Sequence, residues 1–499
     1  MYELYDATPI WRARLLQPLE DEESYQYLDV EVFRFFRERG LPIPSGFGVA
    51  RAAWKNVRTA LAKGDHTEVY RIPKDVERRA FNLLKAHYRH YFRQCRKVDY
   101  EAIKLNPDTA GGFPYNNMTK REVIYGFDEY LRWYLQPGNM DRPPPVFKVT
   151  PKVEYLSEEK LREHKLRLFR NPPLDFLLLE KLYFQEQEDL LNKFDRKTWS
   201  GLGFVKEFGG WNRFVNDLKR KKFFYRWDVA RWDKNMGPKL SHIATELRRE
   251  FYVDYQKEVD CDDWVFLSES AEYALELIFN GQIYQTGNCQ KSGRLRTATD
   301  NTICHIFLLL CHYVLYCDEI GRKIDYDECL EEWINYVYSD DIQGSTNDLG
   351  LVEETRLRRT FQMVGMDVQE YMCSSDIESI HFLGAGNRVF TFDGEEMYVP
   401  HYDEARMFYA MVYTGGSITE LKRAQRIHGL FHNVCFDERA WWVTELMDYL
   451  HLRGKWPETV PRLTVYEVQR SYLGAEAKEG RVFDLFCGEE ARASFPSLF

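Results

Sequence analysis

The sequence has no cysteine pattern that would indicate disulfides. Ten cysteines are spread over 499 residues without a CxxC pair, which suits a reducing compartment better than a disulfide framework. Cys304, His305, Cys311 and His312 are of the residue types that bind zinc, but they lie in an apolar stretch predicted to be helical. Because buried thiols in a core are the commoner case, we interpret these residues as core rather than as a zinc site.

The sequence also lacks the apolar segments of exported and membrane-spanning proteins. Residues 1–24 contain no uninterrupted apolar core flanked by basic residues, and therefore do not predict a signal peptide. The longest apolar run, residues 306–311, is far too short to cross a bilayer. We expect a soluble intracellular protein without a transmembrane segment.

The chain as a whole has no excess of positive charge, because 78 Asp and Glu outnumber 68 Lys and Arg. The formal net charge of −10 is unusual for a protein that binds nucleic acid. The charge is unevenly spread, however, because residues 51–104 carry 14 Lys and Arg against 6 Asp and Glu, a surplus of 8. This segment could line a phosphate track, or it could be a solvated helix surface.

Apolar and aromatic residues are abundant, at 44% and 15% of the chain, which excludes general disorder and allows a large core. A chain of this length is expected to form two or more lobes. Residues before the break QPGNMDRPPP at 136–145 are predicted to be mostly helical. After it, helices and scattered strands predict an α+β fold, with strands too few for a doubly wound sheet; we expect strands near 221–229 and 381–392, and helices near 174–193, 240–258 and 296–317.

Residues 336–345, YVYSDDIQGS, predict a β-hairpin with Asp340 and Asp341 at or beside its turn. Two neighbouring carboxylates repel each other. Such a pair is therefore favourable only in water or beside a cation that neutralises both charges.

A second acidic pair lies earlier in the chain. A strand predicted to end near Asp228 is followed five residues later by Asp233. On a continued strand this odd spacing would place the two carboxylates on opposite faces. The chain must therefore turn after Ala230 if both residues serve one site.

Residues 287–302, GNCQKSGRLRTATDNT, predict a glycine-flanked loop that ends at Ser292 and Gly293 and leads into a helix. Thr297 and Asn301 share one face of this helix, because they are four residues apart. The pair could face solvent. Asn is a mediocre helix former, however, and a polar pair beside a glycine loop is suited to recognising a hydroxyl group.

Taken in this order, the three patterns resemble the palm of viral RNA-dependent RNA polymerases. Motif A would contain Asp228 and Asp233, motif B would run over 292–302, and motif C would contain Asp340 and Asp341. Residues 109–115, TAGGFPY, are similar to motif G, residues 148–173 to motif F, and residues 382–390, FLGAGNRVF, to motif E. The pattern looks closest to plus-strand RNA viruses of the picornavirus and astrovirus kind, with a double-stranded RNA virus as an alternative.

The resemblance covers roughly residues 105–395 and implies a right-hand architecture with an antiparallel palm sheet flanked by helices. The fingers would be mainly residues 1–220, with an insertion at about 240–285. The palm would be residues 221–395 and the thumb residues 396–499.

The resemblance also implies the chemistry. Nucleotidyl transfer needs an activated 3′-hydroxyl and a neutralised pyrophosphate, which two divalent ions about 4 Å apart can supply. We expect Asp228, Asp340 and Asp341 to be catalytic and to bind the metal ions, with the carbonyl of Val229 as a further ligand. Mg²⁺ is the expected ion and Mn²⁺ its substitute, because both are suited to oxygen ligands.

Three further groups of residues follow from the family's motifs. The ribose hydroxyls would be read by Asp233, Ser292, Thr297 and Asn301. The triphosphate would be bound mainly by Arg167, supported by Lys148, Lys152, Lys165 and Arg170, although these could also form a solvated basic run. The template backbone would contact Thr109, Gly111, Gly112 and Pro114, which could equally form an ordinary turn.

The sequence departs from the family's usual pattern at two places. Ser339 stands where motif C commonly begins with Gly. Residues 364–371 offer no Lys to act as the general acid of motif D, so that role would fall to Arg388 or another basic group.

Two other functions remain open. A reverse transcriptase would also show the pattern Y-x-D-D, but it usually carries an aromatic residue where Asp233 stands. A catalytically weak, polymerase-like RNA-binding subunit would not need three carboxylates beside RNA. As a polymerase, the protein would bind RNA template, RNA product and rNTPs, and other viral replication proteins are possible partners. It would act in the host cytoplasm, in a replication complex or with the virion.

Overall fold

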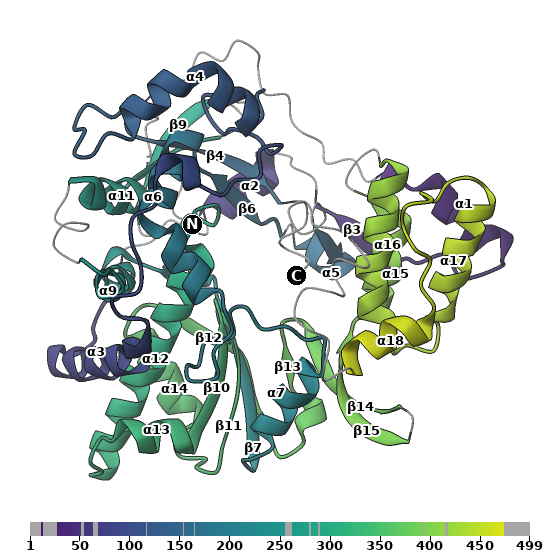
Figure 1. The fold of residues 1–499 in the computed structure, drawn as a ribbon. Coiled ribbons are helices and arrows are strands. Elements are labelled where there is room, and N and C mark those ends of the chain that lie inside the picture. Colours follow the sequence, from purple (N-terminus) through teal and green to yellow (C-terminus); the bar gives the residue numbers. More distant parts are fainter. Residues whose placement is uncertain are drawn as a thin grey trace.

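The computed structural model describes residues 11–12, 27–50, 54–62, 68–115, 117–152, 154–163, 165–254, 262–278, 281–287, 290–392, 394–414 and 418–473. Their helices and strands form three groups, which lie at the upper left, the bottom and the right of Figure 1. We call these groups the fingers, the palm and the thumb, after the predicted arrangement.

The palm is built on a four-stranded antiparallel sheet, as predicted. Its strands follow the order β10 (Trp333–Tyr338), β11 (Asp341–Thr346), β7 (Phe223–Ala230) and β12 (Asp367–Ser374). The palm also contains the small sheet β13 (His381–Phe382), β14 (Ala385–Phe392) and β15 (Glu395–Tyr402). Its helices are α3 (Lys74–Tyr88), α7 (Gly210–Leu218), α8 (Trp232–Asn235), α9 (Pro238–Arg249), α12 (Thr297–Ile320), α13 (Tyr326–Glu332) and α14 (Glu354–Gln362).

The two faces of the palm sheet have different surroundings. Along β7, Tyr225, Trp227 and Val229 are buried in the main core with residues of α12 and α14. The alternate residues Arg226 and Asp228 are only partly buried on the opposite face. Further down that face, α7 and β13 cover Phe224 in a separate apolar cluster. The open part of this face therefore lies beside Asp228.

Helix α12 is the central helix of the palm. By length and composition alone it is apolar enough to cross a membrane, but 78% of its apolar window is buried inside the protein. It packs on α3, α9 and α14, and Cys304 and Cys311 are fully buried in this core. Figure 1 shows it running beneath the fingers and beside the palm sheet. Its apolar character is thus explained by its place in the core, as expected for its cysteines.

The fingers contain a mixed five-stranded sheet in the order β1 (Trp11–Arg12), β9 (Gln282–Thr286), β8 (Ala274–Leu277), β4 (Val146–Pro151) and β6 (Leu168–Asn171). The helices of this lobe are α2 (Trp54–Ala62), α4 (Lys120–Tyr134), α5 (Glu158–Arg162), α6 (Leu174–Leu191) and α11 (Asp262–Glu272). Apolar residues of α4, α6, α11 and β4 form one core cluster.

The thumb combines the C-terminal helices with a helix from the other end of the chain. Its elements are α1 (Val30–Glu38), α15 (Glu404–Val412), α16 (Glu420–Val434), α17 (Trp441–Leu452), α18 (Val465–Leu473) and the pair β2 (Tyr27–Leu28) and β16 (Tyr413–Thr414). The apolar face of α1, with Val32, Phe35 and Phe36, is buried in the thumb core. This apolar face packs on the C-terminal helices, and the assignment of residues 1–220 mainly to the fingers stays a prediction.

A second connection joins the fingers to the thumb. Strand β3 (Phe47–Val49) pairs with β5 (Tyr155–Ser157), and both approach α15 and α16 in Figure 1. The Tyr155 hydroxyl donates a hydrogen bond to the carbonyl of Tyr413 at 2.6 Å. The ring of Phe47 packs on that of Tyr409, with centroids 5.6 Å apart. The two lobes are therefore in contact at a site separate from α1.

We predict that the buried carboxylate of Asp29 holds α1 on the thumb. Its side chain is 0% exposed and accepts hydrogen bonds from Arg423 at 2.9 Å and Arg426 at 3.0 Å. The substitution Asp29→Ala leaves both guanidinium groups without this partner and should lower the free energy of unfolding by about 3–5 kcal/mol. On the same helix, Glu38→Ala removes an exposed carboxylate and should cost less than about 1 kcal/mol. Denaturant unfolding measures both values, and equal effects of the two variants would contradict the prediction.

Candidate active site

The chain turns after Ala230, as the spacing of the two aspartates requires. Strand β7 ends at Ala230, Arg231 adopts the left-handed backbone conformation with φ of 55°, and α8 begins at Trp232. This left-handed residue ends the strand, and Asp233 then lies near enough to Asp340 to act on its pKa, as Asp340 does on that of Asp228. The two carboxylates of the motif A pattern therefore face one region.

The second acidic pair lies at the turn between β10 and β11. Tyr338 pairs with Asp341, so Ser339 and Asp340 form a two-residue turn. Ser339 has a positive φ of 58°. A hairpin turn favours glycine at such a position, because a side chain crowds the left-handed backbone. This conformation explains why a glycine is usual where Ser339 stands.

Helix α12 holds the turn through three consecutive contacts with Ser339. The Ser339 N–H donates to the hydroxyl of Thr302 at 2.8 Å, and the Ser339 hydroxyl accepts from the Asn301 amide at 3.0 Å. The Ser339 carbonyl accepts from Nδ1 of His305 at 3.1 Å. The motif B helix thus fixes the position of the motif C turn. The sequence suggests His305 only as a zinc-type residue and residue 302 only as the end of motif B, and therefore does not predict that either contacts the motif C turn.

His305 also contacts the turn that follows motif A. Its ring lies 4.7 Å from that of Trp232, between centroids, and is fully buried. Burial lowers the pKa of His305 to about 4, so the ring is neutral near pH 7. Because a carbonyl only accepts, the proton of this neutral ring must lie on Nδ1.

Asn301 joins the motif A and motif C residues directly. Its amide nitrogen donates to Asp233 at 2.8 Å and to Ser339 at 3.0 Å. Both amide hydrogens are therefore used. The amide oxygen is buried and has no hydrogen-bond partner among the described residues. A buried acceptor without a donor is unfavourable, so this oxygen is suited to a donor on a ligand.

The carboxylates raise one another's pKa. Surrounding protein displaces water from Asp341 and, together with the charges of Asp340 and Asp228, raises its pKa to about 7. Burial raises the pKa of Asp228, and the charge of Asp340 adds to the effect. For Asp340, burial is again the main cause and Asp233 the second. The four side chains thus form one coupled cluster whose negative charge calls for a cation.

The donor set of this cluster fits hard divalent ions. Asp228, Asp340 and Asp341 supply carboxylate oxygens, and the backbone of Val229 lies next to Asp228. Within the described part of the chain, no group of three or more His, Cys, Asp or Glu side chains is arranged so that it could hold a metal ion. This is compatible with Mg²⁺, which is usually held by one or two carboxylates together with substrate phosphates and water.

Among the predicted triphosphate ligands, the structure brings Arg167 close to the carboxylates. Burial raises the pKa of Asp233, Asp340 and Asp341, and the charge of Arg167 opposes part of that rise. Its own ion pair with Glu154 is long, at 3.7 Å. Arg167 is thus an available cation that faces the cluster from the fingers.

Of the other four basic residues, Arg170 also acts on the cluster, because its charge opposes the rise in pKa that burial causes at Asp233. The Arg170 side chain is 5% exposed and pairs with Glu276 at 2.7 Å. Lys165 pairs with Glu163 at 3.1 Å. Lys152 is exposed and Lys148 is partly buried. Their contact with a triphosphate stays a prediction.

The glycine loops of motifs B and G pack on one segment of the fingers. A Cβ on Gly293 would lie 2.1 Å from the carbonyl oxygen of Arg170, and one on Gly112 would lie 2.5 Å from that of Pro172. The hydroxyl of Ser292 donates to Leu168 at 3.4 Å rather than to Asp233 or Asn301. Both loops therefore need glycine for close backbone contact.

The remaining predicted contacts are local. Thr297 donates within its own loop, to Lys291 at 3.0 Å. Thr109 likewise donates to Asn106 at 2.9 Å. The Gly111 carbonyl accepts from Leu174 at 2.9 Å, and Pro114 lies in the same loop. These bonds shape the two loops, and contact with nucleotide or template stays a prediction.

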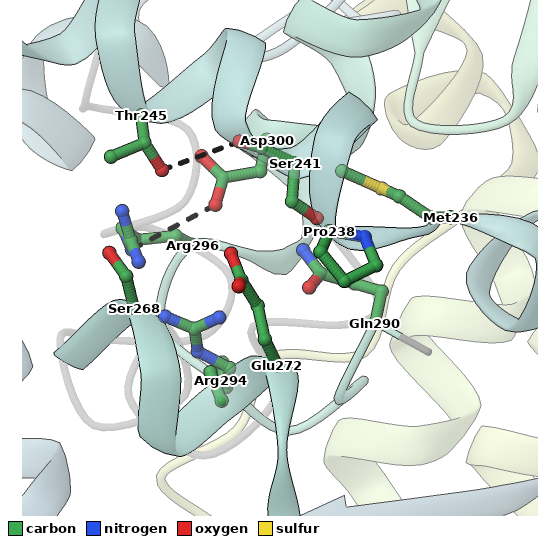
Figure 2. Close-up of a pocket in the computed structure, with 11 residues that line it drawn as sticks. Met236, Pro238, Ser241, Thr245, Ser268, Glu272, Gln290, Arg294, Arg296 and Asp300 are labelled. Atoms are coloured by element: carbon green, nitrogen blue, oxygen red, sulfur yellow. Dashed lines mark hydrogen bonds and ion pairs between the residues drawn. The ribbon is translucent and has the colours of Figure 1, made fainter. Parts of the chain in front are cut away.

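A cluster of buried ion pairs supports the first turn of α12. Arg248 of α9 donates to Asp300 at 2.6 Å, to Thr299 at 2.6 Å and to Glu188 of α6 at 2.8 Å. Figure 2 shows Asp300 and Arg296 on the wall of a small cavity between α9, α11 and the motif B loop. Asp228, Asp340 and Asp341, which are predicted to be catalytic, do not line this cavity. It therefore belongs to the support of motif B.

The family model described as viral RNA-dependent RNA polymerase matches residues 71–440. The chain belongs to this family of viral RNA polymerases. The polymerase is 24% identical over 376 residues to the genome polyprotein of Zucchini yellow mosaic virus (strain Singapore), a match that covers 71% of this chain and 11% of the polyprotein. It is 22% identical over 379 residues to that of Watermelon mosaic virus II (isolate USA), covering 73% of this chain and 35% of that sequence.

A solved structure shows the same fold. The Sicinivirus 3Dpol RNA dependent RNA polymerase matches 91% of this chain and 96% of its own, with a TM-score of 0.71 and 13% identity. The polymerase chain matches only about a tenth to a third of the two polyprotein sequences.

We predict that the His305 N–H positions the motif C turn. The substitution His305→Leu leaves the Ser339 carbonyl without its donor and should lower the free energy of unfolding by about 1–3 kcal/mol. His305→Asn retains an N–H close to the place of Nδ1 and should recover part of this loss. Calorimetric titration with Mg²⁺ should show weaker binding for His305→Leu than for His305→Asn. Identical Mg²⁺ affinities in the two variants would show that the contact does not position the carboxylates.

Proposed function

We propose that this polymerase synthesises RNA on an RNA template by adding rNTPs to an RNA 3′-hydroxyl, with two divalent ions bound at Asp228, Asp340 and Asp341. The coupled acidic cluster at the ends of β7 and β10 supports the metal site. Magnesium bound there, or manganese as its substitute, would activate the 3′-hydroxyl and neutralise the pyrophosphate leaving group. The chain's own contribution is to hold the carboxylates in place through α12.

The unpartnered amide oxygen of Asn301 is the observation that supports an RNA product. Both hydrogens of this amide are donated to protein groups, so its buried oxygen can only accept. A ribose 2′-hydroxyl can supply the missing hydrogen bond, whereas a deoxyribose leaves the oxygen unpaired. A site built to bind a hydroxyl discriminates strongly against the analogue without it.

Arg167 supports the binding of a triphosphate. It approaches the acidic cluster from the fingers, and its only ion pair among the described residues is the long one with Glu154. Guanidinium groups bind phosphate oxygens through a fixed pair of donors. The β- and γ-phosphates would therefore lie on the fingers side of the carboxylates.

The two alternative functions are less consistent with this geometry. In a reverse transcriptase an aromatic residue usually takes the place of Asp233, whereas here Asp233 accepts the hydrogen bond that orients Asn301. An RNA-binding subunit without catalysis gains nothing from burying like charges together, and burial with the charges of Asp340 and Asp228 raises the pKa of Asp341 to about 7. The genome polyproteins among its relatives favour other viral proteins as partners and action in a replication complex in the host cytoplasm.

The metal site is tested by the substitution Asp340→Asn, which removes a charge and keeps the side-chain shape. Labelled rNTP incorporation on a primed RNA template in Mg²⁺ should fall by about 100-fold or more. The control Glu396→Gln removes an exposed carboxylate on β15 and should leave incorporation unchanged. Undiminished synthesis by Asp340→Asn would overturn the assignment.

Sugar selection is tested by Asn301→Asp. A carboxylate cannot donate to Asp233, so the new side chain is repelled and the oxygen facing the ribose is displaced. The ratio of rNTP to dNTP incorporation should fall by about 10- to 100-fold. The control Asn216→Asp changes an exposed amide on α7 and should keep the wild-type ratio. An unaltered ratio in Asn301→Asp would count against ribose recognition by this residue.

A further inference from the structure

A second arginine lies beside the catalytic carboxylates, on the palm sheet itself. Arg226 is two residues before Asp228 on β7, so both side chains are on the open face of the sheet. The residues between and beside them, Tyr225 and Trp227, point into the core. Arg226 is therefore part of the surface on which Asp228 stands.

The guanidinium of Arg226 has weak bonds within the protein. Its only ion pair among the described residues is with Glu370, at 3.5 Å, and the carboxylate of Glu370 is 68% exposed. The Nε atom is buried and has no hydrogen-bond partner. Burial raises the pKa of Asp228 and Asp341, and the positive charge of Arg226 opposes part of that rise, although neither carboxylate forms an ion pair with it within 4 Å. An exposed, long ion pair contributes little and is readily exchanged for another anion.

The surroundings of Arg226 are also polar. Its cross-strand partner on β11 is Gln343, which is 0% exposed. Neither the amide nitrogen nor the amide oxygen of Gln343 has a hydrogen-bond partner among the described residues. Ser345, on the same face of β11, likewise has an unpartnered hydroxyl. On β13, His381 lies near enough for the charge of Arg226 to lower its pKa. A polar strip thus extends from Asp341 down the sheet toward β13.

Two arginines approach the carboxylates from different lobes. Arg167 reaches Asp233, Asp340 and Asp341 from the fingers, whereas Arg226 reaches Asp228 and Asp341 from the palm sheet. If the incoming triphosphate lies on the side of Arg167, the strand that carries the 3′-hydroxyl must lie on the side of Arg226. The last phosphate of that strand is then the anion nearest to this guanidinium.

We propose that Arg226 binds the terminal phosphodiester of the RNA strand that is being extended. This inference rests on the proposed RNA synthesis. Cations bound at the aspartates neutralise their charge, so the arginine is free to bind another anion. The phosphate replaces the weak contact with Glu370 and accepts hydrogen bonds from the guanidinium fork.

The test is a double-substitution cycle measured by binding, which does not require catalysis. A labelled primer–template is bound to the protein without nucleotides, either with a normal terminal linkage or with a neutral methylphosphonate there. Arg226→Gln should weaken binding of the normal RNA by about tenfold and reduce the salt dependence by about one phosphate contact. The methylphosphonate linkage should weaken RNA binding to the wild type by the same factor as Arg226→Gln weakens binding of the normal RNA. It should cause no further loss of affinity in the protein that already carries Arg226→Gln.

Two variants serve as controls. Arg226→Lys keeps a charge without the fork and should lose less affinity than Arg226→Gln. Arg220→Gln removes an exposed arginine that pairs with Asp217 and should bind like the wild type. Thermal unfolding of each variant shows whether it is folded, and the RNA cycle is read on folded protein.

Other outcomes would overturn the inference. If Arg226→Gln raises the KM for rNTP or the inhibition constant of pyrophosphate, with RNA affinity unchanged, the bound phosphate belongs to the nucleotide. If the losses of binding free energy caused by Arg226→Gln and by the methylphosphonate linkage are additive, Arg226 does not contact that linkage. Failure of the wild type to synthesise RNA would refute the proposed function. The RNA-binding measurements would still test the contact between Arg226 and the terminal phosphodiester.

Discussion

The repulsion between acidic side chains at the ends of β7 and β10 is the constraint on which the site depends. Burial raises the pKa of Asp228, Asp340 and Asp341, and the charges of neighbouring carboxylates add to the rise, so the fold must hold these side chains together against their repulsion. Pairing of β7 with β11 fixes the strands, and the hydrogen bonds from α12 fix the turn. A flexible turn would let the carboxylates move apart and relieve the repulsion, so the chemistry of the site requires a rigid turn.

Helix α12 meets two demands with one segment. Its middle turns, residues 303–314, are buried in the core, so its position is fixed by many apolar contacts. Its first turns carry Asn301, Thr302 and His305, which contact the motif C turn. The polar end is in turn held from behind by Arg248 and its acidic partners. The precision of the site therefore derives from the core of the palm.

Local patterns in the sequence predicted much of this site. The hairpin at Asp340, the turn after Ala230 and the helix from Thr297 follow from short-range rules of alternation, spacing and turn chemistry. The contact between Asn301 and Asp233 was expected only from the family's motifs, because their separation of 68 residues carries no local signal. The helix expected at 240–258 ends at Arg249, since Tyr252 leaves it to bridge to Cys95.

Contacts between distant segments could not be predicted from the sequence. Nothing near Val32 shows that its helix packs on the thumb, and nothing near Arg170 shows that it is paired in the core. Both contacts depend on which residues face the helix of Val32 and the side chain of Arg170 after the lobes have assembled. Arg226 was missed for a similar reason, since its proximity to Asp341 arises from strand register rather than from sequence order.

The place of α1 in the thumb has a consequence for the order of folding. Asp29 and Arg423 are 394 residues apart, so the apolar face of α1 has no partner until nearly the whole described chain exists. At about 5–20 residues per second, a ribosome needs roughly 20–80 s to make that length. During this time the first helix remains an exposed amphipathic segment, available to chaperones or to aggregation. The thumb can become native only after translation of its own last helices.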